Sequence, residues 1–319
     1  MMRCVSIAVL LLGAPAFGQT SPAKPSAAAK HWVAPRTPEG APDLQGTWTN
    51  ATITPFERPG TLSGETVLSP SEAATLEEQA AEARIDRPPA PGDTGSYNQL
   101  WFDRGTKVVG TRRSSLVIDP PDGRVPALTA SAQKRQQDAA TYARQHPADG
   151  PEDRSLAERC ILWGTAGPPM VPGPYNNNYQ IVQGPGYVVI LVEMIHDARM
   201  IPTDGRPHLP KSIHQWMGDP RGHWEGDTLV VETTNFTDKT RFRGSDENLR
   251  IVERFRRVDA NTIDYQFTMD DPTAFTRPWS ASIPMTRSDG PLFEYACSEG
   301  NYAMTDILSG ARAEEQRTQ

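Results

Sequence analysis

Residues Leu249–Met269 read LRIVERFRRVDANTIDYQFTM, and this stretch decides the fold class. Apolar and polar residues alternate in Leu249–Val258 and again in Thr262–Met269, which is the pattern of half-buried β-strands. The residues between them, Asp259-Ala260-Asn261, are turn formers. The stretch therefore predicts two antiparallel strands joined by a tight turn.

The same pattern recurs on both sides of this hairpin. Tyr179–Glu193 predicts a hairpin around Gly184-Pro185-Gly186, and Trp279–Cys297 predicts another around Arg287-Ser288-Asp289-Gly290. Further strands are expected at Lys107–Ile118 and Leu229–Thr233. Because no strand-helix-strand alternation is visible, we expect an antiparallel meander, which hides its edges by closing into a barrel or by folding into two sheets. The fold class that we expect is a mainly β, lipocalin-like barrel.

Helices are expected only at the periphery of the barrel. Ser69 or Ser71 can cap a helix over Ala73–Arg84, and Thr129–Arg144 predicts a second helix. Ser155–Ile161 predicts a short third one. The chain also contains 30 prolines, many of them between the expected strands, which indicates long proline-rich loops.

The N-terminus has the pattern of a secretory signal. Arg3 precedes the apolar run Val5–Leu12, and Ala16-Phe17-Gly18 resembles a cleavage site. The run is too short to span a bilayer, so we expect export without membrane insertion, to the periplasm first and to the medium second. The expected organisation is a signal peptide at 1–18, a flexible leader at 19–41 and a single barrel-like domain with helical insertions at 42–319.

Cysteine content and charge limit the function further. Removal of the signal leaves Cys160 and Cys297, which form either one disulfide or two buried free thiols. Acidic residues exceed basic ones, 39 against 32, and the formal charge is −7. That balance speaks against nucleic acid as a partner, because nucleic-acid binding needs a basic surface.

A block of polar residues lies between the apolar runs Tyr187–Val192 and Thr228–Val231. Four of the six histidines of the chain fall in it: His196, His208, His214 and His223. Loops at strand ends often carry chemistry, and histidine exchanges protons near neutral pH. The block therefore indicates an active site.

The segment His196-Asp197-Ala198-Arg199 supplies the main catalytic candidates. His196 would be a general acid or base, Asp197 would orient it, and Arg199 would bind an anionic group. If the preceding strand continued, Asp197 and Arg199 would share one face and His196 would take the other. His208 would be a second acid or base, with a metal ligand as the alternative. The alternative is an Arg–Asp ion pair that only pins a loop.

Further residues could line a substrate cavity. The predicted substrate-binding residues are Tyr175, Asn177, Tyr179, Arg206, Trp216 and Tyr295. Amides and phenols bind hydroxyl or carbonyl groups, and aromatic side chains line small-molecule sites. The alternative for the asparagines is a structured loop of Asx-turns, and the alternative for the tryptophans is the core.

Several blocks of the chain resemble known proteins. Gly46-Thr47-Trp48 before a meander looks like the Gly-x-Trp start of lipocalin-like, or calycin, barrels. Together with other blocks, the chain resembles a family of exported bacterial proteins, mostly of unassigned function. These blocks are Pro42–Trp48, Tyr175–Tyr179, His196–Arg199, Gly205–His208, Trp224–Val231 and Glu294–Cys297. The resemblance implies an export context and a barrel-like fold, without a mechanism.

No cofactor or metal is expected. The histidines lack the spacing of His-Glu-x-x-His, and neither Cys-x-x-Cys, Gly-x-Ser-x-Gly, a P-loop nor Gly-x-Gly-x-x-Gly occurs. The sequence therefore predicts an exported, cofactor-independent acid/base enzyme. It would be a lyase or isomerase for a small hydroxylated or aromatic molecule, with plant-derived (lignin) aromatics as one version. The alternative is a periplasmic small-molecule carrier without catalysis. The sequence leaves open whether the chain forms a homo-oligomer.

Overall fold

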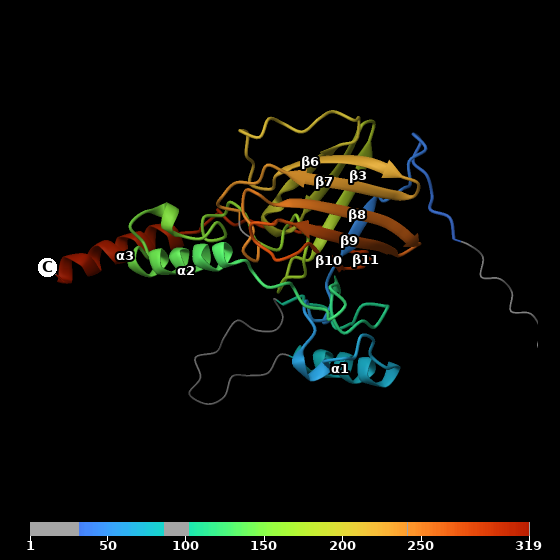
Figure 1. Ribbon diagram of the computed structural model, residues 1–319, viewed down its shortest axis with the longest axis horizontal. Coiled ribbons are helices and arrows are strands. Elements are labelled where there is room, and N and C mark those ends of the chain that lie inside the picture. Colours follow the sequence, from blue (N-terminus) through green and yellow to red (C-terminus); the bar gives the residue numbers. More distant parts are fainter. Residues whose placement is uncertain (1–31, 86–101, 241, 319) are drawn as a thin grey trace, which may run out of the picture. The chain divides into compact units, whose positions relative to one another are not determined.

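The computed structural model describes residues 32–85, 102–240 and 242–318, so the predicted signal peptide lies outside the described residues. Val33–Gln319 forms one compact unit. Its described part contains eleven strands, all paired antiparallel, which confirms the mainly β class (Figure 1). The strands are β1 (Gly46–Thr49), β2 (Val117–Asp119), β3 (Asn178–Gly184), β4 (Tyr187–Val192), β5 (Ala198–Pro202), β6 (Asp219–Glu225), β7 (Thr228–Thr234), β8 (Arg250–Asp259), β9 (Thr262–Asp270), β10 (Trp279–Ser282) and β11 (Met285–Arg287).

The sheet closes almost completely on itself. Its strand order is β5-β4-β3-β1-β11-β9-β8-β7-β6, and β10 pairs with β9 and β2. The end strands β5 and β6 contact each other, so the sheet forms a nearly closed barrel, as the meander predicted. In Figure 1, β6 to β9 cross the near side and β3 lies behind them. A Cβ added to Gly222 of β6 would lie 2.9 Å from Ile201 Cγ2 of β5. The absence of a side chain at Gly222 therefore lets the end strands approach.

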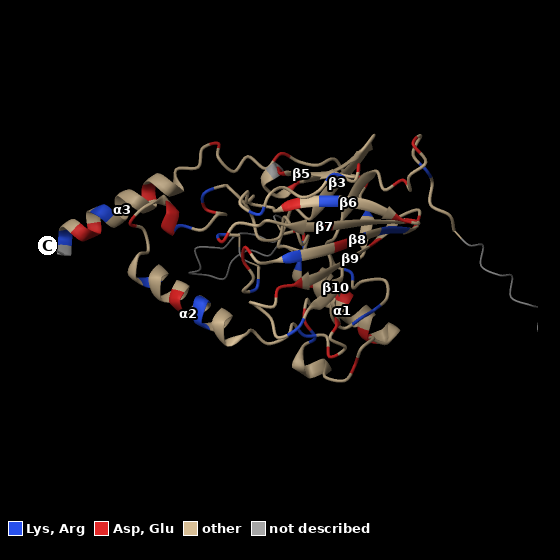
Figure 2. Ribbon diagram, turned by 45° about the horizontal axis from the view of Figure 1, so that its top comes forward, with Lys and Arg blue, Asp and Glu red and all other residues tan. Residues whose placement is uncertain are grey.

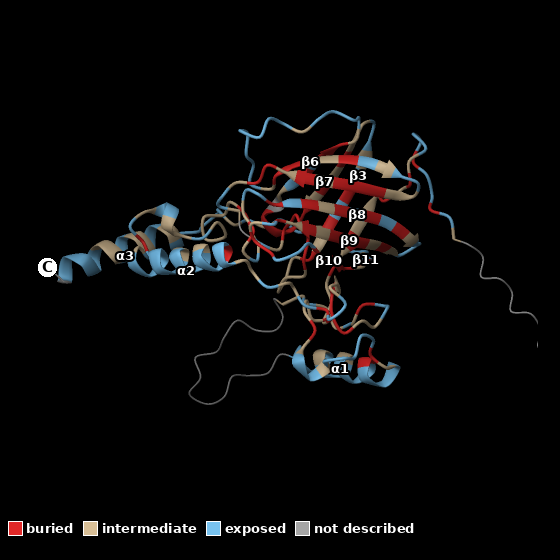
Figure 3. Cartoon of the chain, viewed as in Figure 1, coloured by how far each residue is buried: buried red, intermediate tan, exposed pale blue. Residues whose placement is uncertain are grey.

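The core of the barrel is filled by the inward faces of the strands (Figure 3). In β8 and β9, buried residues alternate with more exposed ones, as the sequence predicted. The ring centroids of Phe255 and Tyr265 lie 4.8 Å apart, and those of Phe267 and Trp279 lie 5.7 Å apart. Each large apolar side chain buried in this way stabilises the fold by about 1.5–3 kcal/mol.

Trp48, from the Gly-x-Trp start, is fully buried and belongs to this core. Its indole nitrogen donates a hydrogen bond to the Leu44 carbonyl at 2.9 Å. The guanidinium of Arg257 lies 5.4 Å from the centroid of the Trp48 ring. The Trp48 side chain thus combines apolar burial with a cation–π contact.

Two helices begin where the sequence predicted. Helix α1 (Pro70–Ala83) starts at a capping box, in which the Ser69 hydroxyl accepts from the Glu72 backbone and the Glu72 carboxylate accepts from the Ser69 backbone. Helix α2 (Ala130–Gln145) starts after Thr129, whose hydroxyl caps its first turn. Both helices expose most of their residues (Figure 3). They are therefore peripheral, as expected.

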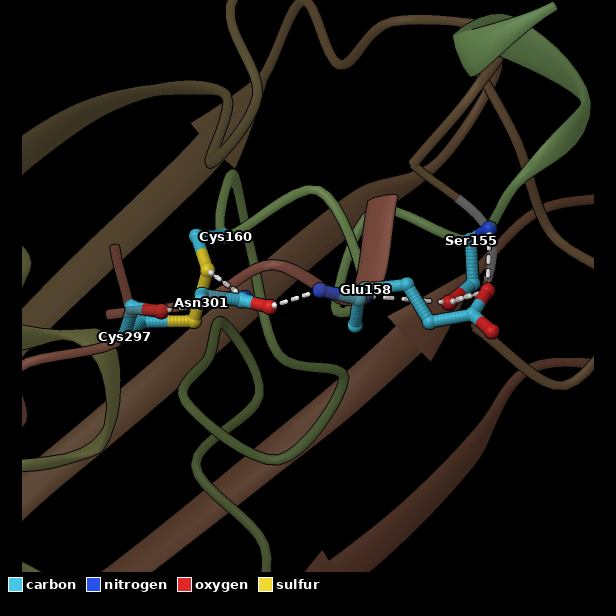
Figure 4. Close-up of a disulfide and its surroundings, with 6 residues drawn as sticks. Ser155, Glu158, Cys160, Cys297 and Asn301 are labelled. Carbon is cyan, nitrogen blue, oxygen red and sulfur yellow. Dashed lines mark hydrogen bonds between the residues drawn. A yellow bond between two sulfur atoms is a disulfide. The ribbon is translucent and has the colours of Figure 1, made fainter. Parts of the chain in front are cut away.

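Cys160 and Cys297 form a disulfide, which decides between the two states left open by the sequence (Figure 4). The amide of Asn301 donates to Cys160 Sγ at 3.4 Å and to the Cys297 carbonyl at 3.1 Å. The bridge spans 137 positions of the chain and ties the segment before helix α3 (Ala303–Thr318) to the loop after α2. Disulfides of this kind persist in oxidising compartments.

The strand predicted at Lys107–Ile118 is wrong except for its last two residues, which belong to β2. The Lys107 carbonyl accepts from the Ile53 backbone, and the Ser114 backbone donates to Thr66. These backbone groups are thus satisfied by neighbouring loops instead of a ladder. Arg112, with φ of 54°, also interrupts the extended conformation.

The helix predicted at Ser155–Ile161 is also wrong, since the chain forms turns there and Cys160 has φ of 55°. The strand predicted at Pro291–Cys297 is absent from the described structure, and Phe293 donates its backbone N–H to the Glu193 carboxylate instead. The sequence did not predict α3. Among the described helices, none has the length and apolar character needed to cross a membrane.

Candidate functional site

The polar block begins with a tight turn. β4 ends at Val192, Met194–His196 forms a 3-10 turn, and β5 starts at Ala198. The Val192 N–H donates to the Asp197 carbonyl at 2.8 Å and closes this turn. Ile195 within it has φ of 61°, a left-handed conformation that costs a β-branched residue about 1–3 kcal/mol. Even-numbered side chains point inward in β4, but after this turn the inward side chains of β5 include Arg199.

The change in alternation at this turn determines which of the residues Asp197 and Arg199 points into the barrel. Arg199 is buried, with 3% of its surface exposed, whereas Asp197 is only half-buried. The side chain of His196 lies outside the part of the chain that the structure describes. The structure therefore places Arg199 among the inward residues of β5, while the catalytic role predicted for His196 stays a prediction.

Arg199 belongs to a buried ionic network inside the barrel. Its Nη1 donates to Glu253 Oε1 at 3.0 Å, and its Nη2 donates to Glu253 Oε2. The Tyr265 hydroxyl donates to Glu253 Oε1 at 2.8 Å and accepts from the Met170 backbone at 3.0 Å. Both terminal nitrogens of Arg199 are thus engaged, which leaves less of its charge for a substrate.

The protonation of this network follows from burial and charge. Burial lowers the pKa of Arg199, but the adjacent Glu253 carboxylate outweighs it and holds the pKa above its ordinary value. Burial raises the pKa of Tyr265 well above its ordinary value, and the charge of Glu253 raises it further. Arg199 is therefore protonated and Tyr265 is neutral at neutral pH.

A cavity of about 420 Å³ lies beside this network, and we name it the β5 cavity. Its lining residues are Ile161, Asp197, Ala198, Arg199, Met200, His214, Gln215, Trp216, Met217, Gly218 and Pro220. Its volume lies within the range of about 300–1,000 Å³ that small-molecule sites occupy. It brings together the predicted residues Asp197, Arg199 and Trp216, and it adds His214.

His214 has a defined tautomer in the β5 cavity. Its Nδ1 lies 2.6 Å from the backbone carbonyl oxygen of Phe236. A carbonyl can only accept, so Nδ1 carries the proton and the neutral ring keeps the lone pair on Nε2. The Nε2 of the neutral His214 ring, an exposed residue that lines the β5 cavity, is therefore a proton acceptor.

His208 belongs to another cluster and is not among the residues that line the β5 cavity. Its Nδ1 lies 3.0 Å from Asp219 Oδ2, and its Nε2 lies 3.5 Å from Glu232 Oε1. The buried Asp219 also accepts from the Leu209 backbone at 2.8 Å and from Arg221 Nη1 at 2.5 Å. Asp219 thus pins the loop that carries His208 to β6.

The predicted binding residues just before and at the start of β3 are held by the structure around them. Asn177 is buried, and its side-chain oxygen accepts from the Gly173 backbone at 2.7 Å, as expected for a structured loop. Tyr179 is fully buried, and its hydroxyl accepts from Asn50 Nδ2 at 3.2 Å. Tyr175 is half-buried and packs against the core. None of these three residues is among those that line the β5 cavity.

The two remaining predicted binding residues also lie apart from the β5 cavity. Arg206 is exposed, forms an ion pair with Asp204 at 2.5 Å, and lies 5.1 Å from the ring centroid of Tyr187. Tyr295 packs against the core two residues before the disulfide. The predicted residues are therefore distributed over several regions of the barrel, and three of them meet in the β5 cavity.

Sequence reasoning missed Glu253, Tyr265 and His214. Glu253 and Tyr265 occupy inward positions of the β8–β9 hairpin, where their neighbours on the same face are apolar. A carboxylate on an apolar face signals a buried partner, so the alternation could have revealed Glu253. Nothing in the spacing distinguishes His214 from the other histidines.

Two further observations bear on the site. Within residues 32–85, 102–240 and 242–318, no three His, Cys, Asp or Glu side chains are grouped so that they could hold a metal ion. Comparison with protein-family models, curated proteins and solved structures finds no match for this chain. The assignment of function therefore depends on the geometry of the β5 cavity.

Proposed function

We propose that this protein is an exported acid/base enzyme, a lyase or isomerase, that acts on a small hydroxylated or aromatic molecule in the β5 cavity. The observation that carries the proposal is His214, whose Nδ1 is fixed by the Phe236 carbonyl and whose Nε2 is the proton acceptor. Asp197 and Trp216 line the same cavity. The disulfide supports an oxidising destination such as the periplasm.

The chemistry starts with a proton transfer. Nε2 of His214 takes a proton from a carbon or hydroxyl of the substrate, and the Phe236 carbonyl stabilises the resulting imidazolium by accepting its Nδ1–H. The carboxylate of Asp197 offsets the new positive charge. The electron pair left on the substrate forms a double bond as a leaving group departs, or accepts the proton at another carbon. The imidazolium then returns its proton to the leaving group or to that carbon.

Trp216 and Arg199 shape the cavity around this step. Trp216, with 36% of its surface exposed, offers an aromatic face to a ring of the substrate. Arg199 is held rigid by Glu253, so it forms a fixed polar wall. His196, next to Asp197 in the chain, stays in this proposal as a second predicted acid or base.

The experiment follows turnover by ¹H NMR in D₂O with a panel of hydroxylated aromatic compounds that includes 4-hydroxybenzoate. We expect product formation or deuterium incorporation with wild type, and a roughly 10²–10⁴-fold loss in His214→Ala and in His196→Ala. His223→Ala is the matched control, because this imidazole is 60% exposed and pairs only with Glu225 among the described residues. Full activity of His214→Ala would refute the role of His214.

A further inference from the structure

A second cavity, of about 850 Å³, lies over the outward faces of β1, β9 and β11, and we name it the outer cavity. It shares no lining residue with the β5 cavity. The segment 103–111 forms its other wall and is hydrogen-bonded to the loop that follows β1. The Thr52 hydroxyl donates to the Lys107 carbonyl at 2.9 Å, and the Val109 backbone donates to the Thr54 hydroxyl at 2.9 Å.

The polar part of this lining consists mainly of hydroxyl and amide side chains. They are Thr49, Thr52, Thr106, Thr111, Thr262, Thr286, Ser282, Ser288, Asn178 and Gln266. Hydroxyl and amide groups both donate and accept hydrogen bonds. Such a lining matches a ligand whose own groups also do both.

Arg113 and Asp264 place a donor and an acceptor in the same cavity. Arg113 Nη2 donates to the Ser282 carbonyl at 2.9 Å, while its buried Nε has no partner among the described residues. Asp264 Oδ2 accepts from Gln266 Nε2 at 3.0 Å. The Arg113 guanidinium and the Asp264 carboxylate, which both line the cavity, thus offer a donor and an acceptor to a ligand.

The charges of the outer cavity disfavour an anionic ligand. Asp103 and Asp259 line it together with Asp264. Two cations also line the cavity. Lys107 is paired with Glu77 at 2.7 Å, whereas Arg113 has no carboxylate at bonding distance among the described residues. Arg113 is therefore the cation that faces the three carboxylates. An uncharged ligand avoids repulsion from the acidic groups.

Apolar surface completes the outer cavity. Phe293 lines it with 69% of its surface exposed, and Val258, Pro284 and Pro291 lie in the same lining. A sugar ring has hydroxyls around its rim and apolar C–H groups on its faces, which pack against aromatic rings. We propose that the outer cavity binds a neutral mono- or oligosaccharide, with its hydroxyls on Arg113 and Asp264 and a ring face on Phe293.

The test uses four probe sugars, cellotriose, xylotriose, maltotriose and chitotriose, in saturation-transfer NMR and calorimetry with the full chain. We expect at least one sugar to bind. Asp264→Asn and Phe293→Ala should each raise the Kd of that sugar roughly tenfold. Phe293→Ala changes an exposed side chain and keeps its backbone hydrogen bond, so it should fold normally. Thermal unfolding and circular dichroism check this.

His214→Ala serves as the control at the β5 cavity and should leave sugar binding unchanged, which separates this inference from the proposed enzyme. The inference is overturned if none of the four sugars binds at millimolar concentration. It is also overturned if a sugar binds equally to wild type and to both outer-cavity variants, because the sugar then sits elsewhere. Octanoate serves as an additional probe. If it binds to wild type but not to Phe293→Ala, and no sugar binds, the cavity is a site for amphipathic acids and the inference is overturned.

Discussion

Replacing Arg199 by Met leaves Glu253 as an isolated buried carboxylate, and we expect the free energy of unfolding to fall by about 3–5 kcal/mol. The two side chains are only 2% and 0% exposed, so water cannot compensate the remaining charge. Glu253→Leu leaves the Arg199 guanidinium unpaired and should be similarly costly. It also removes the acceptor of the Tyr265 hydroxyl, which lies at 2.8 Å.

The double variant Arg199→Met with Glu253→Leu should be much more stable than the two single variants suggest. Replacing a buried ion pair by apolar side chains is often neutral or stabilising by about 1–4 kcal/mol, since both desolvation costs disappear. The Tyr265 hydroxyl keeps its bond from the Met170 backbone but loses its acceptor, which costs about 1–3 kcal/mol. The double variant should therefore lie within about 2 kcal/mol of wild type, with a large coupling between the two sites.

Urea unfolding followed by circular dichroism measures these differences. For a chain of this length the entropy of unfolding is about 0.6 kcal/mol/K, so each single variant should also lower Tm by about 5–8 °C. Arg250→Met is the matched control, because Arg250 pairs with Glu232 on the outer face of the sheet and is 45% exposed. Figure 2 shows the basic and acidic residues of the described chain. Arg250→Met should cost at most about 1 kcal/mol.

Two results would contradict the reasoning. Arg199→Met could cost no more than Arg250→Met, which would mean that Glu253 reaches water or another cation. Alternatively, the double variant could lose the sum of the two single effects, which would mean that the side chains stabilise the barrel independently of each other.

Three further changes test other parts of the structure. Cys160→Ser with Cys297→Ser opens a loop of 137 positions and should lower the free energy of unfolding by up to about 5 kcal/mol; a urea midpoint that matches wild type would contradict this. Burial holds the pKa of Tyr265 above its ordinary value in the folded state only, so the unfolded chain ionises first and stability should fall as pH rises above about 10. Urea midpoints between pH about 9 and about 11.5 should fall less steeply for Tyr265→Phe, and equal slopes would rule out its contribution. Gly222→Ala brings a Cβ to 2.9 Å from Ile201 and should cost about 1–3 kcal/mol in thermal unfolding, whereas Gly184→Ala, with nothing within 4 Å, should cost less than Gly222→Ala.

Elements whose pattern is local could be predicted from the sequence. The β8–β9 hairpin follows from alternation interrupted by a turn, and α1 follows from the capping box of Ser69 and Glu72. The candidate site could be predicted only in part. Asp197, Arg199 and Trp216 were found because ionisable and aromatic residues cluster between two apolar runs.

Elements that depend on distant partners could not be predicted. Lys107–Ile118 has the composition of a strand, yet its backbone groups bond to the loops near Ile53 and Thr66. Likewise, a turn centred on Ile195 resets the alternation, so the face taken by Arg199 could not be read from β4. At Lys107–Ile118, contacts made by other segments outweigh a weak local preference, whereas at Ile195 the left-handed residue of a turn closed by Val192 and Asp197 breaks the alternation.

A mainly antiparallel β protein with peripheral helices follows from the sequence, because alternation, turn residues and helix caps act between neighbours along the chain. The pairing of Arg199 with Glu253, the bond between Cys160 and Cys297, and the contact of β5 with β6 at Gly222 follow from the folded barrel alone. Each of these contacts joins residues far apart in the chain. Its energy depends on burial and distance, and neither quantity exists until the barrel has formed.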